Sequence, residues 1–246
     1  MDLKDKKILI VGASSDIGID LNQALYQSGA IVGLHYHKNA KALLRYKENS
    51  KIKKFRKNLI TAKSCFELID DFVNWAKGID YLVQLSGDIR RPIHWERLTQ
   101  KDWDFDLNMN LIMPFFLAQE VVTYMKRKGG RIILMSTASA PYGGGSTSLA
   151  YGAAKSGIDC IIKKLAKDCA QYNILVNAIA PGFILTKFHT ESLKRTKEQI
   201  EERIKLIPLK RAGTTKEFAA TVMFLLTEGA SYITGQIINV NGGDRL

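Results

Sequence analysis

Residues 8–18 read ILIVGASSDIG, a short apolar run followed by a loop with a glycine at each end, Gly12 and Gly18. A helical pattern of apolar residues covers about 17–28. Gly12 permits a tight turn after a strand, and Gly18 allows the helix to pack closely. The free N–H groups of the first helical turn can then face a phosphate. Two interpretations stay open: a plain strand–helix turn capped by Asp16, or a dinucleotide-binding loop.

The same alternation continues along the whole chain. Further strand-like runs lie at 31–36, 52–55, 80–85, 131–137, 174–180 and 236–240, and helical patterns lie at about 64–77, 99–126, 149–171 and 215–227. This order predicts an α/β fold with a single doubly wound (Rossmann) parallel sheet of seven strands and helices on both faces. We expect one domain over 1–246. The polar, helical stretch at about 183–213 follows the carboxyl end of a strand, where such sheets bind ligands, so we expect a substrate lid there.

Composition excludes several classes of protein. The chain has 246 residues, of which 46% are hydrophobic and 24% charged, as in globular proteins. No apolar run reaches the roughly 18 residues of a membrane span, and MDLKDKK at the N-terminus lacks the apolar core of a signal peptide. The three cysteines form no CxxC pair. We therefore expect a reduced, cytoplasmic protein without a metal site or membrane contact.

The net charge of +12 is concentrated in one stretch. Residues 38–57 hold nine Lys or Arg residues and a single acid, Glu48. Such a patch can attract nucleic acid, an acidic protein or an anionic ligand, although a solvated helix and strand edge explain it most simply. We expect no nucleic acid as partner, because the stretch lacks interleaved stacking aromatics.

The end of the second strand bears on the choice of dinucleotide. An acid there would bind the ribose 2′-hydroxyl of NAD, whereas basic residues would accept the 2′-phosphate of NADP. The chain reads Tyr36-His37-Lys38 at this point, with no carboxylate. The sequence therefore favours NADP, with NAD as the weaker alternative.

Tyr151 and Lys155 stand four residues apart in a predicted helix, so both face one side. A nearby ammonium lowers the pKa of a phenol, which can then exchange a proton with a carbonyl or an alcohol. Tyr124 and Lys128 have the same spacing. They precede the fifth strand, away from the expected crevice, and we interpret them as a basic helix end. Tyr151 instead follows that strand and the Gly/Ser-rich loop 143–148.

Five segments together resemble the short-chain dehydrogenase/reductase family over essentially the full chain: VGASSDIG (11–18), FDLNMNL (105–111), YGAAK (151–155), VNAIAPGFILT (176–186) and SYITGQIINVNGG (231–243). The last two look most like its 3-oxoacyl-carrier-protein reductase branch. The resemblance implies an enzyme that interconverts a carbonyl and an alcohol by hydride transfer. It also implies a catalytic Asn, Ser, Tyr and Lys, matched here by Asn110, Thr137, Tyr151 and Lys155.

The resemblance assigns a role to each matched residue. Tyr151 is the acid/base, Lys155 holds the nicotinamide ribose, and Asn110 orders a water in the proton relay. The residues implied to bind the cofactor are Gly12, Ser14, Ser15, Asp16, Ile17, Gly18, Tyr36, His37, Lys38, Asn58, Leu59, Ser86, Gly87, Tyr151, Lys155, Pro181, Gly182, Ile184 and Thr186.

Three positions depart from the family pattern. Thr137 takes the place of the catalytic Ser, with Ser139 as the alternative on the same face, whereas Ser136 should face the other side. The Asn-Asn-Ala-Gly motif reads QLSG at 84–87, so the hydrogen bonds that tie the loops there must be rebuilt or lost. Asp16 replaces a glycine beside the pyrophosphate, which is tolerable if its carboxylate caps the helix.

An NADP(H)-dependent reductase is the leading functional hypothesis. The alternatives are a non-catalytic dinucleotide-binding member that acts through partners and an anion-binding module built on residues 38–57. The substrate is expected to be a small-molecule or carrier-bound carbonyl compound. The resemblance also implies a homo-oligomer, a dimer or tetramer, formed through the helices at 99–126 and 149–171.

Overall fold

A computed structural model describes residues 3–244, so the two residues at each end of the expected domain lie outside the described part. All strands of its one sheet run parallel, in the order β3-β2-β1-β4-β5-β6-β7. The bounds are β1 Lys7–Val11, β2 Ile31–Tyr36, β3 Ile52–Arg56, β4 Tyr81–Gln84, β5 Gly130–Met135, β6 Ile174–Pro181 and β7 Ile237–Val240. The predicted fold class is confirmed. Because β1 pairs with both β2 and β4, the strand order reverses there and opens a crevice at the carboxyl ends.

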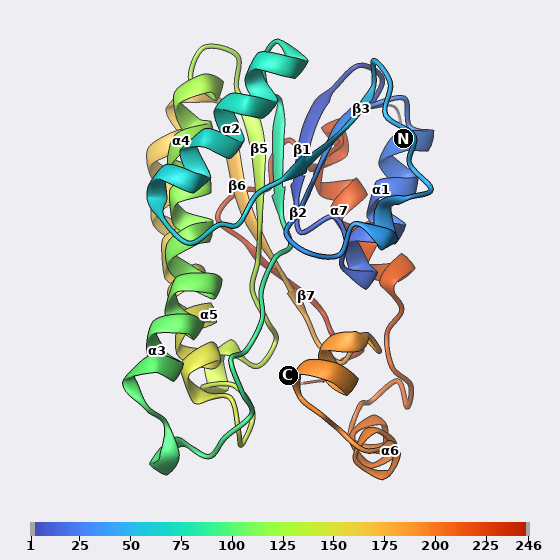
Figure 1. Ribbon diagram of the computed structural model, residues 1–246, viewed down its shortest axis with the longest axis vertical. Coiled ribbons are helices and arrows are strands. Elements are labelled where there is room, and N and C mark those ends of the chain that lie inside the picture. The colour runs from blue at the N-terminus through green and yellow to red at the C-terminus, as the bar shows by residue number, and fades with distance from the viewer. Residues whose placement is uncertain (1–2, 245–246) are drawn as a thin grey trace.

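Helices cover both faces of the sheet (Figure 1). On one face lie α1 (Asp16–Gln27) and α7 (Thr215–Leu225), and on the other lie α2 (Ala62–Ala76), α4 (Met113–Met125) and α5 (Leu149–Cys169). The short helix α3 (Gln100–Leu107) packs against α5. Helix α6 (Lys197–Lys205) belongs to the 183–213 segment and lies apart from both layers (Figure 1).

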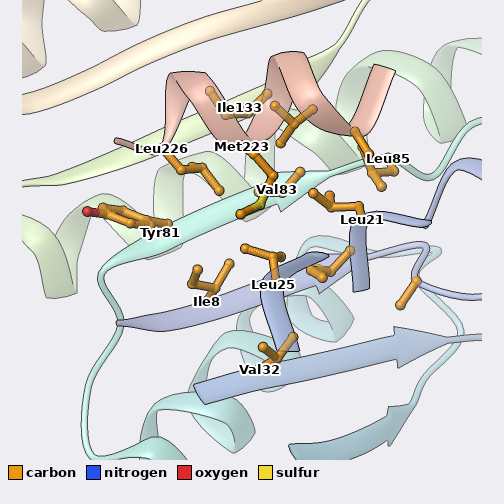
Figure 2. Packing of buried hydrophobic residues seen from close by; sticks show 14 of the residues in the cluster. Ile8, Leu21, Leu25, Val32, Tyr81, Val83, Leu85, Ile133, Met223 and Leu226 are labelled. Atoms are coloured by element: carbon orange, nitrogen blue, oxygen red, sulfur yellow. The ribbon is translucent and has the colours of Figure 1, made fainter. Parts of the chain in front are cut away.

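Alternate residues of the strands feed two separate hydrophobic layers. In β1, Ile8 and Ile10 point toward α1 and α7, whereas Leu9 and Val11 point toward the opposite helices. Figure 2 shows the first layer, in which Leu21 and Leu25 of α1 lie near Val83 of β4. Such strands are covered on both faces and therefore read as continuous apolar runs, which is why the sequence predicts them well.

The prediction of one continuous helix at 99–126 is wrong. It is divided into α3, a π-helical turn at Asn108–Ile112, and α4. Pro114 lies at the start of α4 and has no N–H to donate to the carbonyl of Asn110, so a regular α-helical ladder cannot pass this point. The strand predicted at 131–137 also ends earlier, at Met135. Both changes occur where the chain borders the crevice.

The 183–213 segment contains a π-helical turn, Phe188–Ser192, followed by α6. A capping box between Thr196 and Gln199 begins α6 and satisfies the N–H groups of its first turn. Within the described chain, no helix combines the length and apolar character needed to cross a membrane.

Candidate functional site

A cavity of about 1050 Å³ lies at the carboxyl ends of the strands. It brings together many of the predicted site residues from four distant parts of the chain. Those that line it are Ser14, Ser15, Asp16, Ile17, Gly87, Thr137, Tyr151, Lys155, Pro181, Gly182, Ile184 and Thr186. Its size suits a ligand as large as a cofactor with a substrate.

The glycine turn at the cavity wall requires a residue without a side chain. Gly12 has a φ of +89°, and a Cβ there would lie 2.7 Å from the backbone nitrogen of Ser86. The Gly12 N–H donates to Nδ1 of His35 at 3.3 Å, and His35 Nε2 contacts the carbonyl of Lys57 at 3.0 Å. Burial lowers the pKa of His35 to about 4, so the ring is neutral and holds the turn in place. The sequence analysis missed His35, whose only signal is a polar residue in an apolar strand.

The expectation that Asp16 caps the helix is wrong. Ser15 is the N-cap of α1, and its Oγ accepts the N–H of Gly18 at 3.1 Å. The Asp16 carboxylate instead accepts the N–H of Lys187 at 2.7 Å, across to the 183–213 segment. Ser and Asp are both favourable N-cap residues, so the local sequence does not show which of the two caps α1. The contact between Asp16 and Lys187 decides it, because it takes the Asp16 carboxylate away from the helix end.

The first turn of α1 fits the phosphates of a dinucleotide. The start of a helix leaves N–H groups without intrahelical partners, and Ser14, Asp16 and Ile17 present this turn to the cavity. A Cβ at Gly18 would lie 2.7 Å from the carbonyl oxygen of Ala13, so the turn is packed as tightly as the backbone allows. Helix starts of this kind can hold an anion, so the turn is compatible with the predicted phosphate contact.

The residues predicted at the adenosine end follow β2 and β3. Tyr36 ends β2, with His37 and Lys38 exposed directly after it. Asn58 is exposed and Leu59 is buried after β3. None of these five lines the cavity, although the next residue along, Asn39, does. The structure therefore places these five predicted residues outside the cavity, with Asn39 as its nearest lining residue in the sequence.

Two hydroxyl groups, those of Thr137 and Ser139, line the cavity together with Tyr151. The Thr137 hydroxyl hydrogen bonds to the phenol of Tyr151 and lies 3.2 Å from Oγ of Ser139. Ser136 is fully buried outside the cavity, where its Oγ donates to Asp159. Thr137 and Ser139 thus share the side that faces Tyr151, and Ser136 does not.

Burial controls the charge of both members of the Tyr–Lys pair. Nζ of Lys155 lies 5.7 Å from the centre of the Tyr151 ring and donates to the carbonyl of Met135 at 2.8 Å. Burial raises the pKa of Tyr151, and the charges of Asp106 and Asp88 raise it further. Burial also lowers the pKa of Lys155 to about 7. The expected lowering of the phenol's pKa is therefore wrong here, because burial and the two carboxylates raise this pKa instead.

Asn110 lies in the π-helical turn and is completely buried. Its Nδ2 donates to the carbonyl groups of Asp88 and Asp106 at 2.7 and 2.9 Å, but its Oδ1 has no partner within residues 3–244. A Cβ at Gly87 would lie 2.8 Å from this Oδ1 and 3.4 Å from Nζ of Lys155. The amide oxygen and the ammonium therefore converge on one small space that only a glycine leaves open.

The hydrogen bonds of the altered 84–87 motif are rebuilt. Nε2 of Gln84 donates to Oγ of Ser86 at 2.9 Å, and its Oε1 accepts the N–H of Met135 at 3.5 Å. Gln84 thus ties the loop after β4 to the end of β5. Ser86 does not line the cavity, whereas Gly87 does.

The second Tyr–Lys pair lies away from the cavity. Tyr124 is exposed near the end of α4 and donates to Asp70 at 2.6 Å. This bond is the main reason that the pKa of Tyr124 is raised to about 12. The interpretation of this pair as part of a helix end agrees with its position.

Several cavity residues were not among the predicted site residues. They come mostly from the loop after β4 and from the 183–213 segment, and they include Asp88, Pro92, Phe183, Phe188, His189 and Arg195. The sequence analysis treated this segment only as an expected lid, because loop residues carry no periodic signal. Within residues 3–244 there is no group of three His, Cys, Asp or Glu residues that could hold a metal ion.

Residues 12–244 match the family model described as Enoyl-(Acyl carrier protein) reductase. The chain is 35% identical to the 3-oxoacyl-(acyl-carrier-protein) reductase FabG of Thermotoga maritima, covering 99% of both chains, and 35% identical to Nodulation protein G of Rhizobium meliloti, covering 98% of both. Among solved structures, a short-chain type dehydrogenase/reductase from Mycobacterium ulcerans has the same fold, with a TM-score of 0.90, 24% identity, and coverage of 99% of this chain and 90% of that one.

Proposed function

We propose that this chain, which belongs to the short-chain dehydrogenase/reductase family of oxidoreductases, reduces a carbonyl compound with NADPH or catalyses the reverse oxidation. The observation that carries the proposal is the convergence of Thr137, Tyr151, Lys155 and Asn110 around one cavity beside the glycine loop. The dinucleotide supplies the hydride when bound.

The residues of the chain supply the proton and the orientation. The high pKa of Tyr151 keeps its phenol protonated, so it can donate a proton to a carbonyl oxygen. The Thr137 hydroxyl lies beside this phenol, and once a substrate is bound it can turn its one O–H toward the same carbonyl oxygen. We assign to Lys155 the binding of the nicotinamide ribose, a role supported by its place in the cavity lining beside Tyr151. The unpaired Oδ1 of Asn110, close to Nζ of Lys155, supports a role in holding a water through which Tyr151 regains its proton.

The names of the relatives bear on the substrate. Proteins named 3-oxoacyl-(acyl-carrier-protein) reductase share 32–36% identity with this chain over nearly its whole length. We infer that the substrate is a carbonyl compound, either a small molecule or an acyl group on a carrier. Residues 183–213 act as the lid over this substrate, since the segment forms much of the cavity wall.

Replacement of Tyr151 tests the proposal. NADPH oxidation by a panel of activated ketones, followed at the nicotinamide absorbance band, should be measurable for the wild type. Tyr151→Phe should lower kcat at least ~100-fold, the usual contribution of a positioned acid/base, with NADPH binding nearly unchanged.

Tyr124→Phe is the matched control and should be close to wild type, because Tyr124 lies outside the cavity. Loss of activity in the Tyr124 variant instead would place the active site elsewhere. NADPH binding without turnover of any ketone would favour the non-catalytic alternative.

A further inference from the structure

Two basic side chains of the 183–213 segment are buried or half-buried and yet lack an acidic partner in the described chain. His189 is only 9% exposed, and its Nδ1 has no hydrogen-bond partner in the described chain. Arg195 is half-buried, and its guanidinium lies 5.6 Å from the centre of the Phe183 ring. Within residues 3–244, no carboxylate forms an ion pair with either residue. Both side chains line the cavity.

No nearby acidic side chain in the part of the protein that the structure describes neutralises His189 and Arg195. Arg203 is already paired with Asp244, and Glu202 is paired with Lys205. Glu191 and Glu198 are also in the cavity lining, but both are exposed. Burial and the repulsion of the neighbouring arginines lower the pKa values of His189, to about 4, and of Arg195. An anion bound between the two groups would remove this penalty.

The pair is close to the proposed catalytic residue. The Tyr151 ring lies 5.7 Å from the Phe188 ring, which in turn lies 5.7 Å from the His189 ring. Phe183 supports the other side, because its ring is 4.3 Å from the His189 ring and lies beneath Arg195. A group bound at His189 and Arg195 therefore lies within the length of a small substrate whose carbonyl reaches Tyr151.

We propose that His189 and Arg195 form the binding site for an oxyanion, a carboxylate or a phosphate, carried by the carbonyl substrate. The inference rests on the proposed function and deepens it, because it names an anionic carbonyl compound as the substrate class. The planar guanidinium of Arg195 offers paired N–H donors that match either oxyanion. His189 takes up a proton when the anion binds and adds a second charge-assisted hydrogen bond.

Ring-nitrogen NMR of the histidines tests this directly. The chain has four histidines, and the His189→Gln variant identifies the signal of His189. Titration with glutarate or with methyl phosphate should move the His189 ring nitrogens toward the imidazolium shift and reach saturation. The uncharged dimethyl glutarate should produce no such shift. If glutarate binds more tightly than methyl phosphate, the substrate carries a carboxylate; the opposite order indicates a phosphate.

Variants separate the site from general charge attraction. Arg195→Gln should weaken anion binding at least 10-fold, and Arg195→Lys should restore part of it. Lys197→Gln removes an exposed cation outside this cavity and should leave binding unchanged. Unchanged melting temperatures would show that the variants fold. If Arg195→Gln does not fold, Arg195→Lys replaces it in the test. This variant should also bind glutarate more weakly than the wild type, as read from the His189 shift, but by a smaller factor than is expected for Arg195→Gln.

The inference fails if His189 shifts equally with the neutral ester, or if Arg195→Gln behaves like Lys197→Gln. It also fails if saturating NADP⁺ abolishes the glutarate response, because the pair would then belong to the cofactor site. NADPH oxidation measured on the same preparation is a separate readout. Anion binding without any turnover would overturn the proposed function while leaving the oxyanion site intact.

Discussion

Thr137 and Ser139 illustrate how much depends on single hydroxyl groups in this cavity. Their oxygens lie 3.2 Å apart, yet only the Thr137 hydroxyl bonds to the phenol of Tyr151. The register of the sequence favours Thr137, and its position supports that choice. We therefore expect Thr137 rather than Ser139 to polarise the substrate.

Alanine substitutions should rank these hydroxyls. Thr137→Ala should lower kcat by about 100-fold or more, because the loss of one carbonyl-polarising donor costs a few kcal/mol of barrier. Ser136→Ala should change kcat little, because its hydroxyl bonds to Asp159 outside the cavity. Steady-state kinetics on Thr137→Ala, Ser136→Ala and Ser139→Ala decides the assignment. A normal Thr137→Ala enzyme with an inactive Ser139→Ala enzyme would transfer the role to Ser139.

The buried ammonium of Lys155 should lower the free energy of unfolding at neutral pH. Its pKa is lowered to about 7, so the unfolded chain binds more protons than the folded chain between pH 7 and about 10.5. The penalty is complete below pH 7 and disappears as the pH rises toward 10.5. Lys155→Met should therefore abolish activity but raise the free energy of unfolding by at least about 1 kcal/mol at pH 6.

Denaturant titration at two pH values checks this expectation. The stabilisation by Lys155→Met should be smaller at pH 9 than at pH 6. A variant that is less stable than the wild type at pH 6 would mean that the hydrogen bond to Met135 outweighs the desolvation of the ammonium.

At the scale of elements, the end of β2 should set the choice of dinucleotide. His37 and Lys38 offer basic groups to a 2′-phosphate, and Tyr36 stands where a carboxylate would repel it. A charge-assisted hydrogen bond contributes roughly 1.5–3 kcal/mol, so NADPH should bind at least ~10-fold more tightly than NADH. His37 and Lys38 are exposed, so added salt should weaken the preference.

Dissociation constants from fluorescence titration measure the effect. Replacing His37 and Lys38 together by Ala should remove most of the preference, and Tyr36→Asp should favour NADH. Equal or tighter binding of NADH by the wild type at low salt would refute the assignment and leave the 38–57 stretch without a role in cofactor binding.

The elements also show where sequence reasoning succeeds and where it stops. The central strands were predictable because they are buried on both faces, as with Ile8 and Leu9 of β1 in opposite layers. The π-helical turn was not, because the pattern at 99–126 is helical throughout and the signal is the single Pro114.

The site residues also fall into a group that the sequence could predict and a group that it could not. The motif residues of the glycine loop and the Tyr–Lys helix carry a local spacing that sequence can reveal. His35, His189 and Arg195 carry none, because their roles depend on contacts between segments distant in the chain. The choice of Ser15 over Asp16 as helix cap likewise depends on the contact of Asp16 with Lys187.

At the scale of the whole molecule, the outer surface of α3, α4 and α5 should be an interface between copies. Phe105, Ile112 and Leu149 are exposed there at 36–39%, and the partly buried Phe115 and Phe116 lie on the same helical layer. Several exposed apolar side chains on one surface are typical of a protein–protein interface. Multi-angle light scattering should show a dimer or tetramer of the 27.6 kDa chain. A stable monomer at micromolar concentration would reject the interface.

Transfer of deuterium from the cofactor is the most direct test of the central claim, that this cavity reduces a carbonyl with a hydride from NADPH while Tyr151 supplies the proton. The purified enzyme is incubated with NADPH that carries deuterium at both C4 positions and a ketone that it consumes, and the product is analysed by mass spectrometry. The account predicts an alcohol with one deuterium on the carbinol carbon, formed by the wild type and by Tyr124→Phe but at least ~100-fold more slowly by Tyr151→Phe. An alcohol without deuterium, or equal rates for the wild type and Tyr151→Phe, would contradict it.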